Sequence, residues 1–438
     1  MLVNFTVKNY RSFKEERTFS MEASSIEEHE EAVIKAGNHR LFPLTIIYGA
    51  NSSGKSNLIS AIYTMRRMVM GSVRLNESDP LLYVPFALDE VSRSVPTLFE
   101  VQFIQAETRY CYGFEYTQNE IVSEWLYENG LGEEEVELFV RSKNVIEVSE
   151  KAFPEGRGKE DLTNANRLFL SLVAQLKGEK SNAVMVGIGE CNVVSGIDTK
   201  NYDEITLAMF MKELDGADEA QAFFKELQLG FNRFSVKKTD ITTEKLASLP
   251  KLKRQQVEKN MSAHTLVEAI TAHNIYNEDG QVIDENDFYR DVMESEGTKK
   301  VIELSGPIFD TLINGKTLIV DELDARLHPL LTRNIVLLFM DPERNKHGAQ
   351  LIFATHDTNL LDLSVLRRDQ IWFAEKDKVE STDLYSLVEF EEDGQEEPNN
   401  KHDIERDYIR GRYGAIPFIG KNNTRNYGDT PKTMSLKG

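Results

Sequence analysis

A glycine-rich loop between a short apolar run and an amphipathic segment constrains the fold of this chain more than any other sequence feature. The run at 44–48 is rich in β-branched residues and is typical of a strand. The loop at 49–56 fits the pattern G-x-x-x-x-G-K-[ST], and apolar residues then recur at helical spacing over 58–69. A strand, a glycine loop and a helix in this order form the context in which the pattern binds a polyphosphate, because the loop N–H groups and the helix N-terminus both point at the anion.

The loop predicts how a nucleotide and Mg²⁺ would be held. We expect Lys55 to reach the β- and γ-phosphates as a mobile charge, and Ser56 to place its hydroxyl on the metal ion. A chance match, with the glycines in an ordinary turn and the serine as a helix cap, is the competing interpretation. The residues expected to contact ATP from this segment are Gly49, Asn51, Ser52, Ser53, Gly54, Lys55, Ser56 and Asn57.

Composition limits the class of protein. The chain has 438 residues, which is enough for two or three domains. No stretch approaches the roughly 18 apolar residues that a membrane helix needs, and the start of the chain has no signal-peptide layout. Cys111 and Cys191 are the only cysteines, so we expect no disulfide framework and a cytoplasmic location. With 51 basic and 72 acidic residues the net charge is −21, so any nucleic-acid contact must be a local patch.

The first 150 residues are predicted to hold the glycine loop and an antiparallel lobe. The segment 9–13 lies between two predicted strands, and it is either a hairpin turn with a hydrophobic anchor or a place where an aromatic ring and an arginine stack on a base. The segment 24–39 is acidic and helix-like, and we interpret it as a connector. Period-two alternation over 98–127 predicts a meander. Its aromatic residues favour a packed sheet face, since no basic residues are interleaved with them as RNA readers require.

The middle of the chain changes to helical patterns, and we predict a helical insertion over 151–262. A basic run near its end is either a solvated helix face or a contact with a phosphate backbone or a partner. The basic residues are Lys251, Lys253, Arg254 and Lys259.

Beyond this insertion the pattern returns to strands and helices that alternate. Strands are predicted at 265–276 and 281–283, and a helix is predicted through residue 304. Two buried strands follow at 316–322 and 350–357, joined by a crossover helix over 327–340. Such alternation predicts a parallel sheet whose site lies at the carboxyl ends of the strands.

Polar residues at the ends of these two strands indicate phosphoryl-transfer chemistry. We expect Asp321 to hold Mg²⁺ through water opposite Ser56, Glu322 to polarise the attacking water, and His356 to sense the γ-phosphate. The competing interpretations are a helix N-cap for the two carboxylates and a structural role for the histidine.

The order of these motifs resembles an ABC-type ATPase head of the SMC, RecF and OLD branch. A Ser-x-Gly-Thr turn formed by Ser295, Gly297 and Thr298 corresponds to the signature of that class. The resemblance implies that two subunits sandwich ATP, with the signature of one subunit capping the γ-phosphate bound by the other. It also implies that ATP promotes formation of a homodimer or higher homo-oligomer, and that Asp324 lies at the interface.

A closer likeness covers nearly the whole chain. It is similar to bacterial AAA-labelled ATPases of the RloA and AriA kind, which are associated with anti-phage defence beside a separate effector gene. This implies a toxin–antitoxin-like arrangement with a Toprim-like nuclease or toxin as partner, and no membrane contact. The segments that carry the likeness are 49–57, 294–298, 321–329, 354–361, 368–373 and 408–417.

Two departures from the family pattern matter. We find no convincing Q-loop glutamine, although 83–89 occupies the corresponding place. The part of the chain after His356 lacks the acidic cluster of a Toprim nuclease, so we expect the killing chemistry to belong to a partner.

We therefore predict an α/β fold: an ABC-type P-loop ATPase head with a mixed sheet, an antiparallel β lobe and an inserted helical domain. The two parts of the head are predicted at 1–150 and 263–420, around the insertion and before a polar tail at 421–438. The first hypothesis is an ATP-hydrolysing, Mg²⁺-dependent sensor and scaffold in phage defence. A RecF- or SMC-like ATPase acting directly on DNA and a non-hydrolysing scaffold are the alternatives.

Overall fold

A six-stranded mixed sheet is the central element of the computed structural model, which describes residues 1–130, 134–198, 200–240, 265–390 and 403–416. The strands from β11 to β17 are parallel, and β18 runs antiparallel to β17 at one edge. In sheet order the strands are β11 (Cys191–Ser195), β15 (Thr317–Asp321), β16 (Gln350–Ala354), β5 (Leu44–Tyr48), β17 (Ile371–Lys376) and β18 (Thr382–Ser386).

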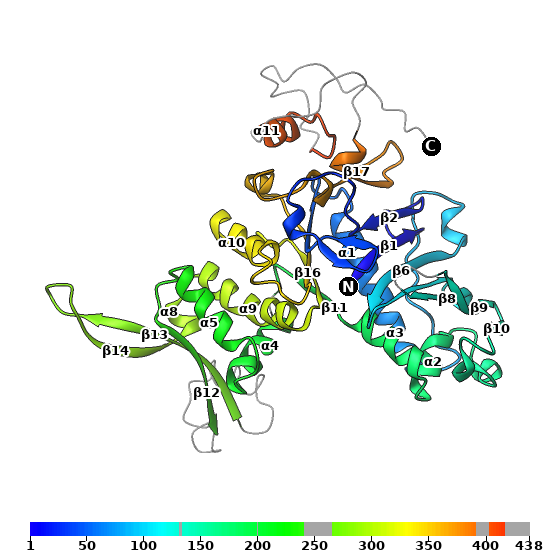
Figure 1. Ribbon diagram of the computed structural model, residues 1–438, viewed down its shortest axis with the longest axis horizontal. Coiled ribbons are helices and arrows are strands. Elements are labelled where there is room, and N and C mark those ends of the chain that lie inside the picture. The colour runs from blue at the N-terminus through cyan, green and yellow to red at the C-terminus, as the bar shows by residue number, and fades with distance from the viewer. Residues whose placement is uncertain (131–133, 199, 241–264, 391–402, 417–438) are drawn as a thin grey trace.

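Both faces of this sheet are covered, because alternate residues of each strand join different cores. Ile47 of β5 packs in the core that contains α1 (Lys55–Gly71), whereas Ile46 packs in the core that contains α9 (Glu296–Asn314) and α10 (Pro329–Met340). Figure 1 shows α9 and α10 on one side of β16 and α1 on the other. The expected parallel sheet with buried strands and a crossover helix is confirmed.

A seven-stranded antiparallel sheet packs over α1. The predicted meander forms β6, β7 and β8, and it continues into two further strands. The rings of Phe99, Phe114 and Tyr116 lie within 6.0 Å of one another in the core, so the aromatic face is packed rather than open for stacking. In sheet order the strands are β10 (Val145–Val148), β9 (Val136–Ser142), β8 (Ile121–Gly130), β7 (Thr108–Tyr116), β6 (Thr97–Gln105), β1 (Leu2–Lys8) and β2 (Arg17–Ser20).

The hairpin loop between β1 and β2 is anchored in this core. Tyr10 and Phe13 are fully buried, and the Tyr10 hydroxyl hydrogen-bonds Thr64 Oγ1 of α1 at 2.9 Å. The interpretation as an anchored hairpin is therefore the correct one for Tyr10, whereas Arg11 stays exposed.

A third region projects from the α9 side of the body. Here α4 (Lys200–Met211) and α5 (Ala217–Glu226) pack against α9, and a short α8 (Arg290–Met293) leads into it. Figure 1 shows β13 and β14 extending away from the rest of the molecule as an arm. The strands of this antiparallel sheet are β12 (Arg233–Asp240), β13 (Thr265–Tyr276) and β14 (Val282–Tyr289).

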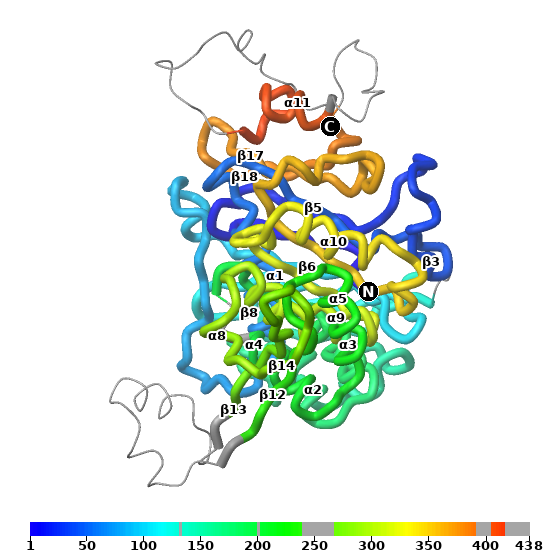
Figure 2. The backbone as a smooth tube through the Cα atoms, turned by 90° about the vertical axis from the view of Figure 1, so that its left-hand side faces the viewer, coloured from blue at the N-terminus to red at the C-terminus, as the bar shows by residue number. Residues whose placement is uncertain are grey.

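The remaining elements are short. Figure 2 shows α11 (Asp403–Ile409) beyond β17 and β18, at one end of the molecule. Two short helices, α2 (Phe169–Gln175) and α3 (Glu179–Gly189), pack with the antiparallel sheet. Within the described residues, no helix combines the length and apolar character needed to cross a membrane. Short 3-10 turns lie at 30–32, 72–74, 92–94, 154–156, 160–162, 358–360, 368–370 and 387–389.

Two sequence expectations need correction. The segment 24–39 is not a helical connector, because Gly37 at φ 58° turns the chain into a hairpin of β3 (Ile34–Ala36) and β4 (His39–Leu41). The region 151–262 is not purely helical, because β11 pairs with β15 inside the central sheet and β12 belongs to the arm. The domain boundaries stay a prediction. The basic run at 251–259 and the tail at 421–438 lie outside the described residues.

Candidate nucleotide-binding and hydrolysis site

The phosphate loop is fixed by close backbone packing at both of its glycines. A Cβ atom on Gly49 would come within 2.4 Å of the Ala374 carbonyl oxygen. A Cβ atom on Gly54 would come within 2.1 Å of Thr382 Oγ1, and this glycine has φ 120°. Ser52 adopts a left-handed conformation with φ 67° between them. The loop therefore requires its glycines for space as well as for backbone conformation.

Lys55 lies folded over this loop. Its Nζ donates hydrogen bonds to the carbonyl oxygens of Gly49 at 2.7 Å and Ala50 at 3.1 Å, and the residue is only 5% exposed. Burial lowers the pKa of Lys55 to about 8, although the carboxylates of Asp321 and Glu322 raise it. The ammonium group thus occupies the mouth of the loop, close to the carboxylates that follow β15.

The strand order brings the predicted catalytic groups together. Since β15, β16 and β5 are neighbours, Asp321, His356 and the phosphate loop all follow adjacent strand ends. Burial lowers the pKa of His356, and the charge of Lys55 lowers it further, while Glu322 and Asp321 have the opposite effect. The side chains of Lys55, Asp321, Glu322 and His356 thus lie in one site. The catalytic role of each is a prediction.

The donor set fits Mg²⁺. Asp321 Oδ1 is buried without a hydrogen-bond partner among the described protein groups, and Ser56 is exposed in the first turn of α1. Mg²⁺ prefers oxygen ligands and is held by one or two carboxylates together with substrate phosphates and water. Asp321 and Ser56 would hold such an ion, which would neutralise charge on the phosphates.

The predicted signature turn caps α9 and contacts the turn that follows β15. Ser295 Oγ accepts a hydrogen bond from the Thr298 backbone N–H at 3.2 Å, and the two hydroxyls lie 2.9 Å apart. A Cβ atom on Gly297 would lie 3.1 Å from the Arg326 carbonyl oxygen. Ser295 is exposed, so its hydroxyl is accessible from outside the subunit.

Sequence reasoning missed the side chains that brace the phosphate loop. Thr382 Oγ1 on β18 donates to the Ser53 carbonyl oxygen at 2.8 Å and lies 2.7 Å from Ser12 Oγ. Ser12 in turn accepts a hydrogen bond from Asn57 Nδ2 at 2.7 Å. Tyr408 of α11 also reaches this region, since a hydrogen bond with the Gly49 backbone opposes the burial that raises its pKa to about 12. Ser53 and Asn57 belong to the phosphate-loop motif, whereas Thr382, Ser12 and Tyr408 lie outside it.

The stretch 83–89, which the sequence places where a Q-loop is expected, packs on the hairpin loop. The Phe86 N–H donates to Asn9 Oδ1 at 3.0 Å, and Lys14 pairs with Asp89 at 3.0 Å. The stretch is thus connected to the phosphate loop through the hairpin that carries Ser12.

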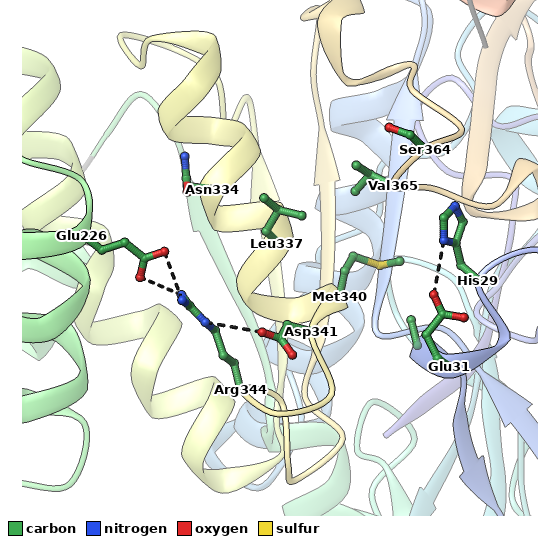
Figure 3. A pocket seen from close by; sticks show the side chains of 11 residues that line it. His29, Glu31, Glu226, Asn334, Leu337, Met340, Asp341, Arg344, Ser364 and Val365 are labelled. Carbon is green, nitrogen blue, oxygen red and sulfur yellow. Dashed lines mark hydrogen bonds and ion pairs between the residues drawn. The ribbon is translucent and has the colours of Figure 1, made fainter.

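A cavity of about 400 Å³ lies elsewhere, between α5, α10 and the segment 29–32 (Figure 3). Arg344 crosses part of it and pairs with Glu226 at 2.9 Å and with Asp341 at 3.6 Å. None of the predicted nucleotide-binding residues lines this cavity.

The fold is an α/β P-loop fold with a mixed central sheet and an antiparallel lobe. The family model described as "AAA domain, putative AbiEii toxin, Type IV TA system" matches residues 44–362, and the chain belongs to this family. No curated protein matches the chain.

Several solved structures resemble the chain at low identity. An SMC head bound to the C-terminal winged-helix domain of ScpA is 14% identical, covers 88% of this chain and 97% of its own, and has a TM-score of 0.46. The SMC head domain from Thermotoga maritima is 13% identical and has a TM-score of 0.39; the match covers 88% of this chain and 98% of the head domain. The recombination mediator RecF with ATP is 13% identical and has a TM-score of 0.33; the match covers 88% of this chain and 97% of the RecF chain.

Proposed function

We propose that this protein binds and hydrolyses ATP as a homodimer, and that it acts as the sensor and scaffold of a defence system with a separate effector. The observation that carries the ATPase proposal is the meeting of Lys55, Asp321, Glu322 and His356 at one edge of the central sheet. Charge neutralisation and positioning of water are what phosphoryl transfer requires, and these residues supply both.

In this proposal Lys55 exchanges its two loop carbonyls for phosphate oxygens when ATP enters. Glu322 follows the end of β15, where its carboxylate polarises the attacking water. His356 takes part as a neutral imidazole, because burial and the charge of Lys55 lower its pKa. The neutral ring can accept a hydrogen bond from water or donate one to the γ-phosphate.

The proposed dimer follows from the position of the signature turn. Ser295 is exposed and Thr298 is half-buried at the N-terminus of α9, where backbone N–H groups favour an anion. A second copy of the chain would bring its ATP to this turn, so each site is completed by both subunits. ATP-dependent association is the expected consequence.

The defence role rests on the family. The description of the matching model refers to a toxin and a toxin–antitoxin system, which supports an assembly with a separate toxin or Toprim-like nuclease. We propose that ATP binding or hydrolysis in the cytoplasm controls whether the effector is held or released.

A turnover assay on the purified full chain tests the ATPase proposal. Wild-type protein should release phosphate from ATP, and Lys55→Ala should lower turnover by about a hundredfold or more. Lys316→Ala is the control, since this lysine pairs with Asp310 at 2.9 Å, near the opposite end of α9 from the signature turn. Retained turnover in Lys55→Ala would contradict the site. Strong stimulation of the wild type by DNA would instead favour a RecF- or SMC-like role.

A further inference from the structure

A buried lysine on α9 binds the main chain of the turn that carries Glu322. Lys300 is 2% exposed, and its Nζ donates to the carbonyl oxygens of Leu323 at 2.8 Å, Glu322 at 3.4 Å and Ala325. Burial lowers the pKa of Lys300 to about 8, and the carboxylate of Asp324 raises it. An ammonium has three donors, and here main-chain oxygens replace the water that burial removes.

The turn that Lys300 binds has an unfavourable backbone conformation. Glu322 has φ 55° and Arg326 has φ 65°, values that residues with a side chain rarely adopt. A left-handed residue at this point persists only where its surroundings impose the conformation. The direction of the Glu322 side chain depends on this backbone, so contacts that fix the turn also aim the carboxylate.

Two other elements hold the same turn. The Gly196 N–H donates to the Asp321 carbonyl oxygen at 2.6 Å, and a Cβ atom on Gly196 would come within 1.9 Å of the Glu322 carbonyl oxygen. The Leu323 N–H donates to the Ala354 carbonyl oxygen at 3.3 Å. The Lys300 contact differs from these two in number and in origin. Lys300 binds three carbonyl oxygens of the turn, and it lies on α9, the helix that begins at the signature turn.

The start of α9 and this turn therefore form one unit. Lys300 lies five residues after Ser295 on the same helix. Gly297 packs on the Arg326 carbonyl oxygen, and Glu296 pairs with Arg326 at 3.5 Å. A movement of the signature turn would be passed to the backbone of Glu322 through the Lys300 side chain.

We infer that Lys300 is a positioning residue for Glu322, and that it couples the signature turn to the hydrolytic carboxylate of the same subunit. The inference rests on the proposed ATPase function and adds a residue outside the phosphate loop, the strand-end carboxylates and the signature itself. The position of a carboxylate relative to water affects the rate of the chemical step much more than it affects binding of the nucleotide. Loss of Lys300 should therefore separate kcat from nucleotide affinity.

The test compares Lys300→Met with Lys316→Met in the full chain. Lys300→Met should lower kcat for ATP by about 10- to 100-fold, while the Kd for a fluorescent ATP analogue stays within about twofold of wild type. Lys316→Met removes a lysine with an ordinary ion pair to Asp310 and should leave both quantities unchanged. If Lys300→Met does not fold, Lys300→Gln replaces it, and the expected loss of kcat is then smaller because the amide can still donate to part of the turn.

A double-mutant cycle with Glu322→Gln separates positioning from a merely structural role. If Lys300 acts through Glu322, Lys300→Met should change the residual turnover of Glu322→Gln by less than about twofold, although it lowers wild-type turnover strongly. Equal effects in the two backgrounds, or a wild-type kcat in Lys300→Met, would overturn the inference. Absence of turnover in the wild type would instead refute the proposed ATPase function.

Discussion

The two halves of the candidate site are held in different ways. The phosphate loop is braced by side-chain hydroxyls and by glycines that leave no space for a Cβ atom, through contacts with β17, β18 and the β1–β2 hairpin. The turn that carries Glu322, with Asp321 and Asp324 beside it, is named the carboxylate turn. It is held by the Lys300 ammonium and by backbone contacts. Asp321 and Asp324 each keep a buried oxygen without a partner among the described residues. The loop keeps one buried hydroxyl, Ser53 Oγ, without a partner among the described residues, whereas the turn keeps two carboxylate oxygens for a nucleotide, an ion or a second subunit.

The largest effect on the affinity for ATP should come from filling the space at the loop. Gly54→Ala places a methyl group within 2.1 Å of Thr382 Oγ1 at φ 120°, so we expect the Kd for ATP to rise by about a hundredfold. Gly230→Ala is the control, because Gly230 has φ 95° but a Cβ atom there would meet no described atom within 4 Å. Titration with a fluorescent nucleotide measures both. Equal affinity of the two variants would show that crowding does not shape the loop.

The carboxylate half should affect chemistry without affecting binding. Glu322→Gln removes the charge that polarises water, so turnover should fall by about a hundredfold or more while ATP stays bound. The trapped nucleotide should keep the protein as a dimer, which sedimentation velocity with and without ATP would detect. A variant that stays monomeric with ATP bound would argue against the sandwich.

Protonation of Lys55 should make ATP binding at the phosphate loop depend on pH. Its pKa of about 8 in the free protein should rise when phosphates surround it, so at pH 8 binding should take up about half a proton. Above that pH the affinity should fall by up to about tenfold per unit, because binding must first protonate the amine. Calorimetry in buffers of different ionisation enthalpy measures the uptake. Lys55→Ala should abolish it and Lys300→Met should not, since Lys300 binds the carboxylate turn.

The smallest effect on the affinity for ATP should come from removing the Thr382 hydroxyl, which braces the phosphate loop. Thr382→Val removes the hydroxyl that binds Ser53 and Ser12, so the Kd for ATP should rise by about 3- to 10-fold. Thr332→Val is the matched control, because the Thr332 hydroxyl is buried without a partner among the described residues. It should leave affinity unchanged and stability equal or higher. A Thr382 variant with wild-type affinity would show that the brace is not needed for binding.

Local patterns predicted the parts of the site that lie next to one another in sequence. The loop at 49–56 and the ends of β15 and β16 were identified because a strand that ends in polar residues leaves a clear pattern. The signature turn was placed correctly at the start of a helix. Their assembly at one sheet edge followed from strand–helix alternation, which the structure confirms.

The features that sequence reasoning missed depend on contacts between distant residues. The segment 24–39 has a helix-like composition, but Arg367 donates to the carbonyl oxygens of Ile26 and Ser24 and so binds main-chain oxygens at the start of the segment from a distant part of the chain. The five residues of β11 are too few to show a period, and their place in the sheet depends on pairing with β15. Thr382 and Lys300 act on carbonyl oxygens, which every residue has, so no motif marks them.

The projecting arm has a consequence for aggregation of the protein at high concentration. Strand β14 is the edge of its sheet among the described residues, and its backbone could pair with a strand of another molecule. Three exposed carboxylates lie on this strand, Asp284, Glu285 and Asp287, and the last two also pair with Arg233 and Lys237 of β12. Charged side chains on an edge strand work against its pairing with another molecule, so the hairpin can extend into solvent with less tendency to aggregate.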